Sequence, residues 1–155
     1  MGTRMSADGR PLPVPNPTTQ PYFDAAGRGQ LRIQRCPRDG FFFYPRSRCP
    51  GCLGNDWSWQ DVSGRGEVHA FTIDRMGHDP ALASEVPFVI AVVELEEGPR
   101  MTARIVDCAF DDVRIGMPLE ARFESIEDIT LVRFAPSAGV DRLDDQGSCE
   151  RSSTT

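Results

Sequence analysis

Three cysteines and one aspartate are spaced like the ligands of a small metal site. Cys49 and Cys52 form a C-x-x-C pair with a Pro-Gly turn between them, and Cys36 and Asp39 have the same separation. Structural zinc sites are tetrahedral and closed, and they take thiolates and, less often, carboxylate oxygens. The spacing therefore predicts a zinc knuckle whose ligands are Cys36, Asp39, Cys49 and Cys52.

The aspartate leaves a second interpretation open. A carboxylate is a harder ligand than a thiolate and is less usual opposite three sulfurs. The same segment could be a relic knuckle that folds without metal around the aromatic run at residues 41–44. If the knuckle does hold a metal, a site with four protein ligands has no open position for a substrate or an activated water. We interpret the knuckle as structural.

The residues around the knuckle predict a short helix and a ribbon strand. Residues 18–35 contain both, and residues 36–56 contain the knuckle. Two glycines end the helix early, and so short a helix is marginal on its own. Its apolar side consists of Tyr22, Phe23 and Ala26. We therefore expect these three side chains to bind a partner protein.

The remainder of the ordered sequence, residues 57–135, has an all-β pattern. Five strands with turns between them suit a small closed barrel, because closure removes the sheet edges. The strands are expected at residues 67–73, 88–95, 101–106, 119–124 and 129–134. Residues 1–17 are rich in Pro and Gly, and residues 136–155 lose apolar content, so both are expected to be disordered.

Charge is distributed unevenly along the chain. All 17 basic residues are arginine, and the formal net charge is −6. Residues 28–65 hold seven arginines and three aspartates, whereas residues 66–155 hold eight arginines and eighteen acids. A chain of this overall sign is a poor generic nucleic-acid binder. The arginines near the knuckle could still meet a few phosphates or an acidic protein face.

Composition also limits the compartment and the chemistry. Of five cysteines, three lie in the knuckle, which favours metal ligation in a reducing cytoplasm over disulfides. Cys149 is not counted as a ligand, and Cys108 is interpreted as a small core residue. No apolar run is long enough to span a membrane, and no secretion signal is present. The cytoplasm is the expected location.

A catalytic role for the chain itself has little support in the sequence. The two histidines are His69, within a strand pattern, and His78, next to Asp79 in a loop. Adjacency in a loop establishes no catalytic geometry, so His78 is interpreted as a solvated side chain. The sequence contains no nucleophile elbow and no phosphate-binding glycine loop. No catalytic residue is predicted.

The order of these elements resembles a known family. Helix, strand, knuckle, the glycines around Arg65, a buried strand and the segment Val113 to Pro118 are similar to the zinc-ribbon OB-fold family of acyl-CoA-associated proteins. The resemblance covers about residues 18–135. It implies a mostly β fold with a short N-terminal helix, a rubredoxin-like zinc ribbon and a five-stranded OB-fold barrel. Asp39 departs from the family's four-cysteine pattern.

The resemblance also implies a function. Members of that family are non-catalytic subunits or domains that accompany thiolase-superfamily enzymes, including thiolases and retro-aldolases that shorten acyl-CoA side chains such as those of steroids. The implied ligand is a coenzyme A thioester bound jointly with the partner. Candidates for contact with the coenzyme A phosphates are Arg35, Arg38, Arg46 and Arg48. The alternative is a single-strand nucleic-acid-binding OB-fold protein. The positive charge lies on the ribbon rather than on the barrel, which argues against this alternative.

Overall fold

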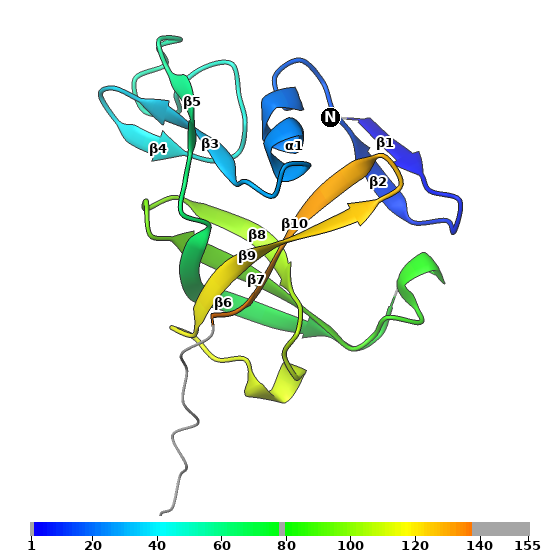
Figure 1. Ribbon diagram of the computed structural model, residues 1–155. Coiled ribbons are helices and arrows are strands. Elements are labelled where there is room, and N and C mark those ends of the chain that lie inside the picture. Colours follow the sequence, from blue (N-terminus) through cyan, green and yellow to red (C-terminus); the bar gives the residue numbers. More distant parts are fainter. Residues whose placement is uncertain (1, 78–79, 138–155) are drawn as a thin grey trace, which may run out of the picture.

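The computed structural model describes residues 2–77 and 80–137. It contains a closed five-stranded barrel, a three-stranded ribbon sheet, a two-stranded hairpin and one α-helix. Figure 1 shows the helix between the ribbon and the hairpin, with the barrel beneath them. Within the described residues, no helix has the length and apolar character needed to cross a membrane. The mostly β fold predicted from the sequence is confirmed.

The helix α1, Gln20–Ala26, is short for the reasons expected from its sequence. A proline occupies its first turn, where a missing N–H costs nothing, and Gly27 follows its last residue. Thr19 stands at the N-cap without capping the helix, because its hydroxyl oxygen accepts a bond from the Asn16 N–H at 2.9 Å. The helix packs against β10 and β3, which supply the tertiary support that its length requires.

The ribbon sheet has the strand order β4–β3–β5, and its strands are antiparallel. Its strands are β3 (Arg32–Cys36), β4 (Gly40–Phe42) and β5 (Ser58–Asp61). Cys36 pairs with Gly40 across the turn that joins β3 to β4. Gly40 has a φ of +79°, a conformation that glycine adopts without strain. This turn places Cys36 and Asp39 beside each other.

The barrel closes in the strand order β10–β8–β7–β6–β9. Neighbouring strands of the barrel are antiparallel except β10 and β8, whose parallel contact at Phe134 and Ile105 closes the barrel. A bulge lies between Val68 and Ala70. The strands are β6 (Arg65–Asp74), β7 (Phe88–Leu95), β8 (Arg100–Ile105), β9 (Pro118–Ile126) and β10 (Ile129–Pro136), with single 3-10 turns at η1 (Pro80–Leu82) and η2 (Phe110–Asp112).

Two hydrophobic clusters stabilise the molecule. The larger fills the barrel around Phe134 and Val93, both fully buried, and continues through Leu31 and Ile33 into the base of the ribbon. Cys108 packs against it, as the sequence suggested. The smaller cluster lies under the metal-ligand turns and consists of Cys36, Phe42 and Cys49 with Cys52 and Trp57 packed against them. Because Phe41 and Phe43 contact the larger cluster, the knuckle and the barrel are only partly independent.

The disorder predicted for residues 1–17 is wrong for residues 2–17. Gly2–Met5 (β1) and Pro11–Val14 (β2) form an antiparallel hairpin. Leu12 is 1 % exposed, and Arg4 forms ion pairs with Glu127 and Asp128 in the turn between β9 and β10. Figure 1 shows that turn reaching from the barrel to the hairpin. The local composition is that of a disordered segment, but distant partners order it. The predicted tail falls mostly at residues 138–155, outside the described residues.

Candidate metal centre

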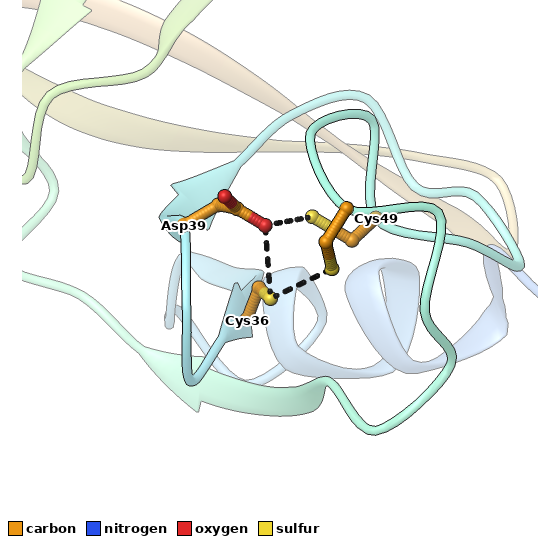
Figure 2. A group of neighbouring side chains, drawn as sticks. Cys36, Asp39 and Cys49 are labelled. Atoms are coloured by element: carbon orange, nitrogen blue, oxygen red, sulfur yellow. Dashed lines mark hydrogen bonds between the residues drawn. The ribbon is translucent and has the colours of Figure 1, made fainter.

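The four predicted ligands converge at one end of the ribbon. One ligand atom from each of Cys36, Asp39, Cys49 and Cys52 lies within 4.8 Å of all the others. The end of β3 supplies Cys36, the β3–β4 turn supplies Asp39, and the loop before β5 supplies the other two. Figure 2 shows Cys36, Asp39 and Cys49 pointing toward one another. The knuckle predicted from spacing alone therefore exists as a spatial cluster.

The separations between these atoms suit a tetrahedral metal ion. Asp39 Oδ2 lies 3.4 Å from Cys36 Sγ and 3.2 Å from Cys49 Sγ, and the sulfurs of Cys36 and Cys52 are 3.6 Å apart. Around zinc, bond lengths of about 2.3 Å to sulfur and 2.1 Å to oxygen give edges of ~3.8 Å between sulfurs and ~3.6 Å between sulfur and oxygen. The observed edges are slightly shorter. The residues present fit a zinc ion after a small expansion.

The cluster is buried on one side and open on the other. Cys36 and Cys49 are each 1 % exposed, Cys52 is half-buried, and Asp39 is exposed. A backbone bond from the Leu53 N–H to the Cys49 carbonyl, at 3.0 Å, closes the C-x-x-C turn. Hydrogen bonds from the thiols of Cys52, Cys49 and Cys36 hold the pKa of the Asp39 carboxyl below its usual range. Asp39 is therefore an ionised acceptor at neutral pH, as a metal ligand must be.

The four candidate arginines do not gather at one place. Arg35 lies with its guanidinium 5.6 Å from the centre of the Phe41 ring, and Arg48 donates to the Leu53 carbonyl at 3.0 Å. Arg46 Nε donates to the Tyr44 carbonyl at 3.2 Å, and Arg38 is exposed on the β3–β4 turn. Across residues 2–77 and 80–137, none of the four forms a salt bridge.

Arg46 borders a groove that the sequence did not predict. The groove has a volume of about 560 Å³ and lies between α1, the loop after β4 and strands β8 and β10. Its lining includes aromatic side chains and two arginines, and none of the described lining residues is acidic. These side chains are Tyr22, Phe23, Phe43, Tyr44, Arg46 and Arg133. Arg133 is paired with Glu124, so Arg46 supplies the cationic edge of an apolar groove that suits an anion with an apolar arm.

A buried glutamine fixes one wall of this groove. Gln34, 1 % exposed in the middle of β3, donates to the Arg46 carbonyl and accepts from the Arg46 N–H, both at 2.8 Å. A buried amide with both ends paired holds the Arg46 backbone in place. The sequence could have pointed to this contact only through Gln34 itself, a polar residue on the buried side of β3. It could not reveal the partner twelve positions away.

Only part of the apolar side of the helix is free to bind a partner. Ala26 is 2 % exposed and belongs to the chain's own core, so its assignment to a partner is wrong. Tyr22 also packs against that core, with its ring 5.7 Å from that of Phe43. Phe23 is half-buried and lines the groove. Tyr22 and Phe23 thus border the groove, and only their exposed edges can meet another molecule.

His69 is exposed on β6, with Nδ1 3.8 Å from Glu94 Oε2. His78 and Asp79 lie outside the described residues.

The fold and the ligand cluster match two family models that lie side by side along the chain. Residues 23–58 match the rubredoxin-like zinc ribbon domain of ChsH2, and residues 59–124 match its C-terminal OB-fold domain. The chain belongs to this family of DUF35 proteins, in which a zinc ribbon precedes an OB-fold. The resemblance noted from the sequence is confirmed, and the ribbon is of a type that holds zinc.

Similarity to individual proteins supports the assignment of the chain to this family. A DUF35 domain-containing scaffold protein of Methanocaldococcus jannaschii is 38 % identical over 96 residues, which cover 61 % of this chain and 67 % of that protein. A probable enoyl-CoA hydratase alpha subunit of Thermomonospora curvata is 35 % identical over 130 residues, 83 % of this chain. The match spans 40 % of that longer protein, about two fifths of its length.

A solved structure corresponds to most of this chain. It is described as an Ltp2-ChsH2(DUF35) aldolase, and the compared chain is 34 % identical to this one with a TM-score of 0.72. The alignment covers 82 % of this chain and 100 % of that chain.

Proposed function

We propose that this protein is a non-catalytic accessory subunit of a thiolase-superfamily enzyme, a thiolase or a retro-aldolase, that acts on acyl-CoA thioesters. The observation that carries the proposal is the correspondence with the compared chain of the Ltp2-ChsH2(DUF35) aldolase, which is aligned from end to end. A likeness that covers an entire chain of an assembly supports the same kind of role here more strongly than a shared domain would.

The groove supports coenzyme A as the shared ligand. Its aromatic walls suit the apolar pantetheine arm, and its cationic edge suits phosphate oxygens. Of the four arginines proposed as phosphate contacts, Arg46 borders the groove, whereas Arg35, Arg38 and Arg48 are not part of its lining. We therefore rank Arg46 first for the phosphate contact.

Zinc has a structural role in this proposal. Cys36, Asp39, Cys49 and Cys52 would hold it, and the ion would cross-link the β3–β4 turn to the loop before β5. That loop segment continues from residues 43–47, which form the groove wall. The metal thus supports the groove from a distance, while Gln34 fixes Arg46 directly.

The test is co-expression of this chain with a thiolase-like protein encoded nearby. A stable complex on size-exclusion chromatography, with acyl-CoA cleavage that needs both proteins, is the expected result. A panel of acyl groups that includes a steroid side chain would define the substrate. The relative named as a hydratase subunit provides the competing outcome. Enoyl-CoA hydration with a hydratase partner, and no complex with the thiolase-like protein, would contradict the proposal.

A further inference from the structure

Gly51 lies directly against the carboxylate of Asp39. A Cβ atom at position 51 would stand 2.8 Å from Asp39 Cγ and 3.0 Å from each carboxylate oxygen. Real Cβ atoms are essentially never found within 3.0 Å of another heavy atom, so the two groups could not both stay in place. The backbone at Gly51 is not in the left-handed region. Glycine at this position therefore leaves the carboxylate its present place, and its role is to provide space rather than conformational freedom.

The carboxylate is also the ligand nearest to solvent. Asp39 is exposed, whereas two of the sulfurs belong to residues that are 1 % exposed. One oxygen, Oδ2, lies 3.4 Å from the Cys36 sulfur and 3.2 Å from the Cys49 sulfur. A single oxygen can therefore bind the ion as one corner of the tetrahedron. That corner is the hard ligand of the set, and the other three are soft.

We propose that Asp39 is the exchangeable ligand of the metal centre and that Gly51 is the residue that positions it. The ion enters and leaves through the Asp39 corner, because the buried sulfurs close the opposite side. Gly51 keeps the carboxylate turned inward by leaving its own side of the turn free of any side chain. This inference rests on the assignment of a zinc ribbon. It does not depend on which enzyme the chain accompanies.

The experiment compares metal binding in full-length variants. Cobalt(II) replaces zinc, because its visible spectrum reports the number of thiolate ligands and the geometry. Transfer of zinc to a chromogenic chelator then gives the exchange rate. Asp39→Cys should add sulfur-to-cobalt charge-transfer intensity and slow the exchange, since thiolate is the softer ligand. Gly51→Ala should weaken metal binding by about 10- to 100-fold, as changes that misplace a ligand do.

Two controls separate this role from a general disturbance of the ribbon. Asp56 is an exposed carboxylate of the same loop that is not part of the ligand cluster, so Asp56→Asn should leave spectrum and rate unchanged. Gly2 also has a backbone that alanine accepts, and a Cβ there meets its nearest atom at 3.6 Å. Gly2→Ala should likewise have no effect on the metal.

A double-mutant cycle decides the matter. If Gly51 acts through the carboxylate, Gly51→Ala should change nothing further in an Asp39→Ala background. The inference is overturned if Gly51→Ala weakens binding equally with and without Asp39. It is also overturned if Asp39→Ala leaves both the cobalt spectrum and the exchange rate as they are in the wild type. Failure to bind a thiolase-like partner would affect neither result, so the two proposals fail separately.

Discussion

The ribbon and the barrel use arginine in different ways. On the barrel, arginines pair with glutamates, as Arg133 does with Glu124 at 2.8 Å and Arg65 with Glu96 at 2.9 Å. On the ribbon, Arg32 pairs with Asp61 in the same way, but Arg46 binds a backbone carbonyl and forms no salt bridge within the described residues. Paired surface charges contribute about 0–1 kcal/mol to stability and have little capacity left for a ligand. The comparison indicates that Arg46 is available to bind an anion.

The strongest way to separate the two regions is to remove the metal. We expect about one zinc per chain, and its removal should unfold residues 36–52 while the barrel remains folded. The smaller cluster depends on Cys36 and Cys49, whereas the barrel core contains no ligand. Hydrogen exchange with and without chelator should show protection lost in the ribbon and kept in β7 and β8. Freshly purified, never-chelated protein without metal on elemental analysis would refute this prediction.

A second way to separate the two regions is to shorten a side chain of the groove wall that belongs to neither hydrophobic cluster. Phe23→Ala should weaken the complex with the enzyme subunit by ~1–3 kcal/mol, because a half-buried aromatic ring is a typical interface anchor. The isolated chain should keep its melting temperature. Calorimetric titration measures the affinity, and thermal unfolding measures the stability.

The control for Phe23 lies on the buried side of the same helix. Ala26 is 2 % exposed, so Ala26→Leu should overpack the core and destabilise the isolated chain by ~1–3 kcal/mol. If Phe23→Ala instead melts the chain and leaves affinity unchanged, the ring belongs to the core.

The smallest expected effect concerns a single charge. Arg46→Ala should raise KM for acyl-CoA in the complex by about 10-fold with little change in kcat, because a phosphate contact far from the thioester holds ground and transition states alike. Arg65→Ala, which breaks a barrel ion pair, is the matched control and should change neither constant. A shortened pantetheine thioester lacks the nucleotide. If Arg46→Ala raises KM for this shortened thioester as much as for acyl-CoA, the arginine serves the protein interface.

Local patterns predicted much of this molecule. The knuckle follows from ligand spacing over a few residues, and the barrel strands follow from alternation along each strand. What the sequence missed depends on distant contacts. The hairpin at residues 2–14 is ordered through Glu127, and the groove wall is fixed by Gln34. Ala26 was assigned to a partner because its apolar character does not say which surface covers it.

The hairpin has a consequence for the order of events during synthesis. Arg4 is 123 positions from Glu127, so the hairpin leaves the ribosome well before the turn against which it docks. Domains are usually completed as the chain emerges, from the N-terminus onward. Here residues 2–14 find their place only after the turn between β9 and β10 has been made. Contacts of such long range slow folding, and they make the docked hairpin a marker of a completed barrel.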